Sequence, residues 1–312
     1  MRVSAVPAVG LLIMSLLGCG APATEETAEP TLETAVPAAE PGVVSVMAEE
    51  FAFTAPPTFP SGWVTLRFDN QGEEPHFVMI LELPEGVTFD DYASQVATPF
   101  GELYAQYRAA ELDQGAFFEQ LGAMAPEWFY TLKRAGGPGF TAPGTTSETT
   151  IHLTPGEYIL ECYVRSMDAD DTFHSEHGML RPLIVTEESS GLAAPEANID
   201  IVLSNYTLAV EGDLSAGEHM ARVRVTENPE GLVFHNVHLV RLDDETTGET
   251  VASWMNWVDE MVPPAPAEFL GGAGQASAGV ESFIAVTLEP GRYAWVSEMQ
   301  GLRGMVHEFT VE

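Results

Sequence analysis

The sequence predicts an all-β protein made of two related sandwich domains, and three observations carry this prediction. Short segments rich in β-branched and aromatic residues recur along the chain, namely Val43–Phe53, Gly62–Phe68, Phe77–Leu83, Glu148–Leu153 and Glu157–Val164. Turn dipeptides separate them, as at Pro155-Gly156. The pattern also occurs twice. Many short strands with frequent turns are typical of β-sandwiches.

The internal repeat defines the domains. Gly136-Gly137-Pro138-Gly139 matches Gly271-Gly272-Ala273-Gly274, and Pro155-Gly156 matches Pro290-Gly291, in each case at an offset of 135 residues. Two further blocks match at other offsets: His76-Phe77-Val78 with His235-Asn236-Val237, and Gly178-Met179-Leu180 with Gly304-Met305-Val306. Because the blocks persist while the distances between them change, each copy is interpreted as one domain with variable loops.

The repeat sets the expected boundaries. The first domain spans residues 43–187, a polar linker covers 188–197, and the second domain spans 198–312. The first copy carries an insertion at about 88–134, in which apolar residues recur at helical spacing. We therefore expect short helices inserted into an otherwise β domain.

The N-terminus predicts export. Residues 1–18 combine a basic start with a short apolar run of roughly ten residues, as in a signal peptide. Leu16-Leu17-Gly18-Cys19 resembles a bacterial lipobox, which implies lipidation of Cys19, and residues 19–42 have the composition of a flexible spacer. The alternative is an ordinary signal peptide with a chance cysteine. We expect a protein of the cell envelope, outside the cytoplasm and lipid-anchored to a membrane, in the periplasm or on the outer surface.

Composition excludes several functions. The net charge of −35 repels nucleic acid, so nucleic-acid binding is not expected. The acidity fits either salt adaptation or an ordinary soluble surface. The chain has no nucleophile elbow, phosphate-binding glycine loop or paired Cys-x-x-Cys motif. We therefore do not expect an enzyme.

Four residues of the first copy have the chemistry of a metal site. If Cys19 is lipidated, Cys162 has no partner for a disulfide within the chain. A blue-copper centre needs a thiolate, two imidazoles and a weak thioether. His76, Cys162, His174 and Met179 supply these groups in this order, with His177 as an alternative to His174.

At these residues the sequence resembles the cupredoxins. The run from Asn70 to His76, with Gly72 and Pro75, is similar to the first copper histidine of plastocyanin-type proteins. The Pro-Gly-x-Tyr hairpin that leads to Cys162 resembles their penultimate strand, and the His-x-x-x-Gly-Met ending at Met179 resembles the type 1 site of copper nitrite reductases. The resemblance covers most of residues 43–187 and is weaker in the second copy.

The resemblance implies two tandem cupredoxin-like Greek-key β-sandwiches and one copper ion held by His76, Cys162, His174 and Met179. Two departures stand out. Eleven residues separate the cysteine from His174, more than in compact electron carriers. Glu161 precedes the cysteine, where copper nitrite reductases have a histidine, so that activity is not expected.

The second copy lacks the thiolate. Ser297 stands in place of Cys162, and no histidine lies between it and Met305. We therefore expect a membrane-tethered protein with one copper in the first domain, acting in one-electron transfer or copper handling with a redox partner protein. The alternative is a metal-free recognition lipoprotein, whose partner contacts the aromatic residues of the insertion.

Overall fold

The computed structural model describes residues 42–166, 172–231 and 234–312, which belong to one compact unit, Ala39–Glu312. The predicted signal peptide, Cys19 and the spacer up to residue 41 lie outside the described residues. Strands dominate the unit and helices are few, so the prediction of an all-β fold is confirmed. No helix among the described residues has the length and hydropathy required to cross a bilayer.

Two sheets that share one long strand enclose the first part of the core. The strands are β1 (Val43–Glu49), β2 (Ala52–Thr54), β3 (Thr58–Asn70), β4 (Met79–Glu82), β5 (Lys133–Gly136), β6 (Thr146–Leu153), β7 (Gly156–Glu161) and β8 (Leu180–Ser189). The start of β3 pairs with β8, whereas its remainder pairs with β1 and β6. Leu66 of β3, Val46 of β1 and Ile159 of β7 are fully buried in the same cluster, so both sheets face one core.

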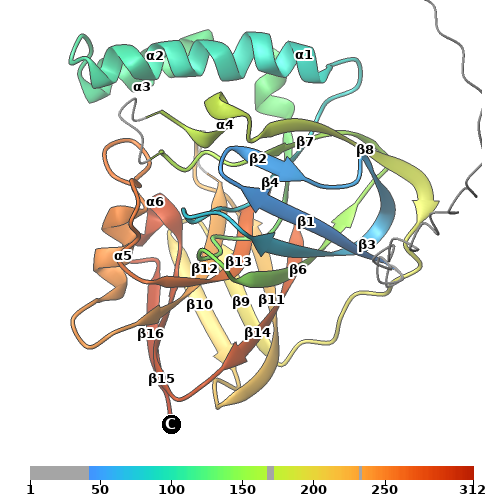
Figure 1. The fold of residues 1–312 in the computed structure, drawn as a ribbon, viewed down its shortest axis with the longest axis vertical. Helices are drawn as coiled ribbons and strands as arrows, with labels where there is room; N and C mark the ends of the chain where they lie inside the picture. The colour runs from blue at the N-terminus through green and yellow to red at the C-terminus, as the bar shows by residue number, and fades with distance from the viewer. Residues whose placement is uncertain (1–41, 167–171, 232–233) are drawn as a thin grey trace, which may run out of the picture. The chain divides into compact units, whose positions relative to one another are not determined.

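The second half repeats this order of pairing. Its strands are β9 (Ile199–Ser204), β10 (Thr207–Gly212), β11 (Gly217–Glu227), β12 (His235–Leu242), β13 (Glu268–Ala276), β14 (Glu281–Leu288), β15 (Gly291–Val296) and β16 (Val306–Val311). The order β1–β3–β6 recurs as β9–β11–β14, and β5–β4–β7–β8 recurs as β13–β12–β15–β16. Figure 1 shows the strands of this half in yellow to red.

The two halves join edge to edge about an approximate two-fold axis. Strand β6 pairs antiparallel with β14, and Thr149 lies opposite Ile284, which is 135 residues further along the chain. A second contact pairs Pro138 with Ala273, again 135 residues apart. Because equivalent residues meet at both contacts, the junction is symmetrical.

The repeated glycine motif forms this junction. The amide of Gly139 donates to the carbonyl of Gly272 at 3.0 Å, and the amide of Gly274 donates to that of Gly137 at 2.8 Å. A Cβ on Gly139 would lie 2.7 Å from the Cα of Gly272, and one on Gly137 would lie 2.1 Å from the carbonyl oxygen of Val78. The backbones approach so closely that no larger residue fits.

One predicted strand is wrong in extent. Val43–Phe53 is interrupted by a turn, so that β1 and β2 pair with each other in antiparallel fashion. The turn contains Phe51, which has a positive φ of 63°. The carboxylate of Glu50 accepts hydrogen bonds from the backbone amides of Glu73 and Glu74. This contact ties the turn to the loop before β4.

Helices lie in the predicted insertion. They are α1 (Phe89–Tyr92), the π-helix η1 (Ala93–Ala97), α2 (Thr98–Arg108), α3 (Gln114–Met124) and the 3₁₀-helix η2 (Glu127–Thr131). Figure 1 draws α1 and α2 above β7 and α4 (His174–His177). Tyr104 and Phe117 are buried in a cluster with Val258 of the second half, and the hydroxyl of Tyr104 donates to the Val258 carbonyl at 2.9 Å. These two aromatic rings are therefore core residues and not part of an exposed surface.

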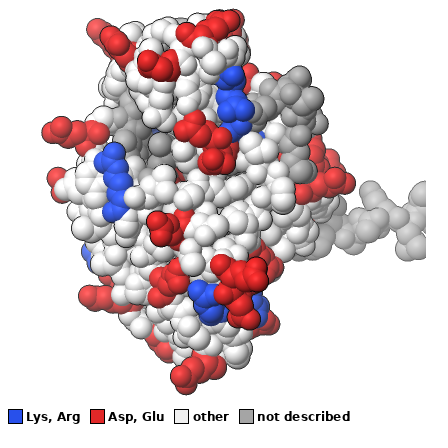
Figure 2. Space-filling view, turned by 90° about the vertical axis from the view of Figure 1, so that its left-hand side faces the viewer, with Lys and Arg blue, Asp and Glu red and all other residues white. Residues whose placement is uncertain are grey.

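Acidic side chains are spread over the surface. Figure 2 shows many Asp and Glu residues and few Lys and Arg residues on one face of the protein. This agrees with the 47 acidic and 12 basic residues of the sequence. A surface of one predominant sign disfavours polyanionic ligands.

Candidate metal centre

The loop between β3 and β4 carries His76 and is fixed by one asparagine. Asn70, the last residue of β3, is fully buried, and its amide nitrogen donates to the carbonyls of Glu74 and Thr141, both at 2.8 Å. Its amide oxygen accepts from the backbone N–H of Gly72 at 3.0 Å. The backbone of His76 exchanges two hydrogen bonds with Thr141. Both the amide and the carbonyl of His76 are thus hydrogen-bonded, which fixes the backbone that carries the imidazole.

The loop after β7 carries Cys162 and is closed by its own backbone. The amide of Cys162, the first residue beyond β7, donates to the carbonyl of Met179 at 3.0 Å. His174 begins α4, and its amide donates to the carbonyl of Val164 at 2.8 Å, while the amide of Met179 donates to the carbonyl of His174 at 3.0 Å. These bonds bring the two ends of the loop together.

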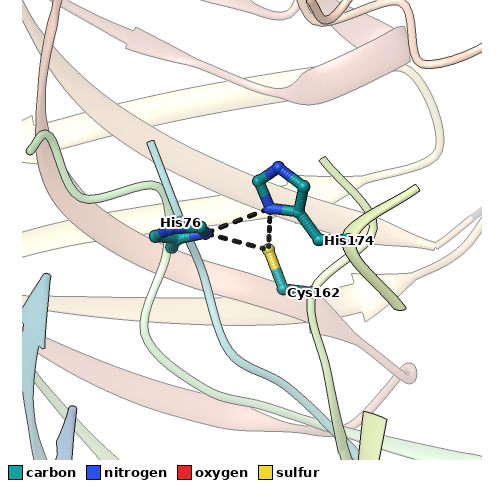
Figure 3. A group of neighbouring side chains, drawn as sticks. All are labelled: His76, Cys162 and His174. Carbon is teal, nitrogen blue, oxygen red and sulfur yellow. Dashed lines mark hydrogen bonds between the residues drawn. The ribbon is translucent and has the colours of Figure 1, made fainter. Parts of the chain in front are cut away.

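The three side chains converge in the interior (Figure 3). The Sγ of Cys162 lies 3.9 Å from Nδ1 of His76 and 3.7 Å from Nδ1 of His174, and the two nitrogens are 3.1 Å apart. All three residues have 0% exposure. Within the described parts of the chain, they are the one group of three converging His, Cys, Asp or Glu ligands. The cluster could hold one metal ion.

The protonation states of His76 and Cys162 are compatible with a cation bound between them. Burial, and secondarily the nearby His174, lowers the pKa of His76 to about 3, so the ring is neutral and able to ligate a metal. Its Nε2 has no hydrogen-bond partner among the described residues, since the carboxylate of Glu50 is 3.8 Å away. Burial raises the pKa of the Cys162 thiol to about 12. Holding a thiolate here requires a compensating positive charge, which a metal ion supplies.

Met179 and His177 occupy different environments. Met179, the predicted axial ligand, is fully buried, and its backbone bonds to Cys162 and His174 keep it beside the cluster. Its role as a ligand stays a prediction. His177 is exposed, its Nε2 lies 2.6 Å from the hydroxyl of Thr172, and its ring packs on Phe51. The geometry therefore favours His174 over His177 as the second imidazole.

Sequence reasoning missed a carboxylate at the centre. Glu74 is 3% exposed, and its Oε2 lies 2.5 Å from Nε2 of His174. A carboxylate on the far nitrogen orients an imidazole and increases its basicity as a ligand. Phe51 covers the same ring edge-on, with the ring centroids 5.3 Å apart. Glu74 and His174 are 100 residues apart in the sequence, so no local pattern relates them. The presence of Glu74 in the loop that carries His76 is the one sequence signal for this contact.

The residues on either side of Cys162 enter buried polar networks. Tyr92 of the insertion donates to the carboxylate of Glu161 at 2.8 Å, and Tyr163 donates to the carboxylate of Glu298 at 2.8 Å. Burial raises the pKa of Glu161, and burial raises that of Glu298 to about 7. The strand end that carries the cysteine is thus bonded both to the insertion and to the second repeat.

The second repeat has buried residues at the positions equivalent to part of this site. Ser297 is 1% exposed, and its hydroxyl lies 3.4 Å from the side-chain oxygen of Asn236. His235 and Met305 are fully buried, and neither nitrogen of His235 has a hydrogen-bond partner among the described residues. Without a thiolate, these residues lack the donor set of the first repeat.

Comparisons with known proteins return copper proteins at low similarity. No family model and no curated protein matches the chain. An auracyanin from Roseiflexus castenholzii aligns with 46% of this chain and 97% of its own at 17% identity and a TM-score of 0.25. Auracyanin B aligns with 39% and 94% at 22% identity and a TM-score of 0.28. A multicopper oxidase aligns with 86% and 88% at 12% identity and a TM-score of 0.23. Since TM-scores below 0.5 do not establish a common fold, the site rests on its own geometry.

Proposed function

We propose that this chain is a cupredoxin-like copper protein that holds one copper ion in its first repeat and transfers single electrons. The observation that carries the proposal is the buried convergence of one sulfur and two imidazole nitrogens 3.1–3.9 Å apart. A thiolate with two imidazoles and a thioether nearby is the donor set of a blue-copper centre. The repeats 43–187 and 198–312 would be tandem cupredoxin-like domains, the second without a metal.

The residues of the site have distinct tasks in this proposal. Bound copper would supply a one-electron redox couple. Cys162, His76 and His174 would hold the ion, and Met179 would offer a thioether sulfur as a weak further ligand. Glu74 orients the imidazole of His174. The complete burial of the three donors keeps water out and their positions fixed. Such burial favours a redox ion that stays bound over a copper ion that the protein transfers to another molecule.

Reconstitution with Cu(II) tests the proposal. The full-length chain should bind about one copper ion, measured by elemental analysis, and show an intense visible charge-transfer band. Cys162→Ser should abolish the band, because a hydroxyl is a hard donor that stays protonated. Met179→Leu should keep the copper and shift the band.

The two histidines of α4 supply a matched pair of variants. His174→Ala should remove most of the band, whereas His177→Ala, which alters an exposed ring outside the cluster, should leave it intact. A colourless protein whose Cys162 stays freely titratable in the presence of Cu(II) would contradict the copper proposal. That result would leave the metal-free recognition lipoprotein as the remaining reading.

We further propose that the protein works outside the cytoplasm, anchored to a membrane through a lipid on Cys19. Cys19→Ala should release the protein into the soluble fraction or leave it unprocessed, as cell fractionation would show. A mature-size variant that stays with the membrane would contradict lipidation. The net charge of −35 favours a redox partner with a basic docking face.

A further inference from the structure

The tip of a short hairpin covers the metal cluster on the side of its imidazoles. Glu50 and Phe51 are the residues between the paired strands β1 and β2, and they form this hairpin tip. The ring of half-buried Phe51 lies 5.3 Å from that of His174 and 4.6 Å from that of exposed His177, centroid to centroid. The carboxylate of Glu50, which is 34% exposed, lies 3.8 Å from Nε2 of His76. The hairpin tip thus separates both imidazoles of the cluster from the solvent.

Two glycines make room for the hairpin tip. A Cβ on Gly72 would lie 2.5 Å from the carboxylate of Glu50, and one on Gly178 would lie 2.6 Å from the carbonyl oxygen of Phe51. The same carboxylate accepts hydrogen bonds from two backbone amides of the loop between β3 and β4. A side chain at Gly72 would displace it from these bonds, and one at Gly178 would displace the backbone of the hairpin tip. The tip is therefore seated on both loops that carry the histidines of the cluster.

The second repeat offers an internal comparison. Its equivalent tip is Asn205-Tyr206, between β9 and β10, where the ring of Tyr206 is 43% exposed and lies under the guanidinium of Arg303. Gly231, which has the same position before the histidine of its repeat, and Gly304 are the equivalent glycines. At both of them an added Cβ would meet no described atom within 4 Å. Of the two repeats, the described residues thus seat the tip in the one that carries the metal donors.

The hairpin tip is suited to open without unfolding of the domain. Strand β2 has three residues and is paired with β1 at the margin of the described sheet. Phe51 has a φ of 63°, a region that is costly for a bulky residue. Segments with few backbone pairings open locally at a lower free energy than the core around them. Displacement of this tip would therefore uncover the cluster while both sheets stay folded.

We propose that the hairpin tip is the gate through which the metal ion enters and leaves its centre. The inference rests on the proposed function, because it names the route of that ion. Cys162 and Met179 adjoin the hydrophobic core, which offers a hydrated ion no path. On the side of the imidazoles, Glu50 and Phe51 need only leave the two loops on which they are seated.

The accessibility of the Cys162 thiol tests the gate without copper. In the full-length chain with Cys19→Ala, Cys162 is the one cysteine. The probe is methyl methanethiosulfonate, a small uncharged reagent: the thiolate attacks its sulfenyl sulfur, methanesulfinate leaves, and mass spectrometry reads the added methylthio group. Phe51→Gly should accelerate labelling of the metal-free protein about tenfold or more, because the contacts of the ring with both histidines are lost. Glycine readily adopts the φ of this position, so the turn itself is kept.

Two further variants separate gating from a general loss of stability. Glu50→Ala removes the acceptor of two loop amides but keeps the ring of Phe51, so it should also accelerate labelling and decides the test if Phe51→Gly does not fold. Phe309→Ala removes a half-buried ring from the second repeat and should leave the rate unchanged. Equal rates in Phe51→Gly and the parent would overturn the proposal. Equal acceleration by Phe309→Ala would also overturn it, because labelling would then require unfolding of the domain.

The uptake of Cu(II) tests the route of the ion. In stopped-flow mixing, the visible band should appear faster in Phe51→Gly than in the parent, by a factor similar to that of labelling. Equal rates of colour formation would overturn the gate and leave the copper site in place. A parent that gains no colour would contradict the proposed function instead, and the labelling rates would still decide whether the hairpin tip covers the cluster.

Discussion

The asparagine at the end of β3 can be tested by Asn70→Ala. The side chain makes three hydrogen bonds, to the carbonyls of Glu74 and Thr141 and from the amide of Gly72, and it is fully buried. Alanine leaves all three backbone groups without that partner. Since the shortened side chain supplies no polar atom, the loop that carries His76 loses its main internal constraint.

The expected loss of stability follows from this count. Each hydrogen bond lost in the interior costs about 1 kcal/mol, so the three together are worth about 3 kcal/mol. For a domain of this size, 1 kcal/mol shifts the melting temperature by about 2–4 °C, which predicts a decrease of roughly 6–12 °C. The copper affinity should fall as well, because His76 would no longer be held in place.

Urea unfolding of the metal-free protein measures the effect, read from the midpoint at an unchanged slope. Gln71→Ala is the matched control, because Gln71 is the next residue, is exposed, and its side chain bonds only to that of Asp69 among the hydrogen bonds described. Its backbone bond to the carbonyl of Ala48 stays in the variant. It should change stability by less than about 0.5 kcal/mol. If Asn70→Ala costs no more than Gln71→Ala, the assignment of Asn70 as the constraint on this loop is refuted.

Three further predictions follow from single contacts. Glu74→Gln, which replaces the carboxylate on His174, should weaken copper binding roughly 10–100-fold in a chelator competition. Gly139→Ala should destabilise the protein in urea unfolding because its Cβ would lie 2.7 Å from a backbone atom, whereas Gly122→Ala in helix α3, which has open space, should be neutral or stabilising. Burial lowers the pKa of His238 from 6.5 to about 3, so the unfolded state alone takes up its proton and stability falls as the pH decreases from about 6.5 towards 3. When the pH is lowered from 7.5 to 5, the free energy of unfolding of His238→Gln should decrease by about 2 kcal/mol less than that of the parent protein.

Local patterns in the sequence were sufficient for the strands, because alternating β-branched residues and Pro-Gly turns act over a few positions. The three side chains that converge, those of His76, Cys162 and His174, could be named from the sequence for the same reason, since each follows a local motif. The contact between Glu74 and His174 was not readable, because it joins residues 100 positions apart that no periodicity relates. The turn at Phe51 was also hidden, since a positive φ at a phenylalanine has no signal in its own sequence.

The repeated glycine motif was visible in the sequence, but its structural role at the junction of the two halves was not. Sequence identity between two segments indicates a shared conformation, and here the two segments also contact each other. Such a contact depends on how the halves are placed in space. Only the structure could supply that placement.

The symmetry of the junction restricts which residues a dimer of identical chains could place there. An interface in which each position meets its own equivalent is the isologous interface of a homodimer, and here it is closed within a single polypeptide. Tyr163 and Glu298 are equivalent positions, 135 residues apart, and they hydrogen-bond to each other at 2.8 Å. A homodimer would have to place two tyrosines or two glutamates there, whereas a single chain can carry a different residue at each of the two equivalent positions.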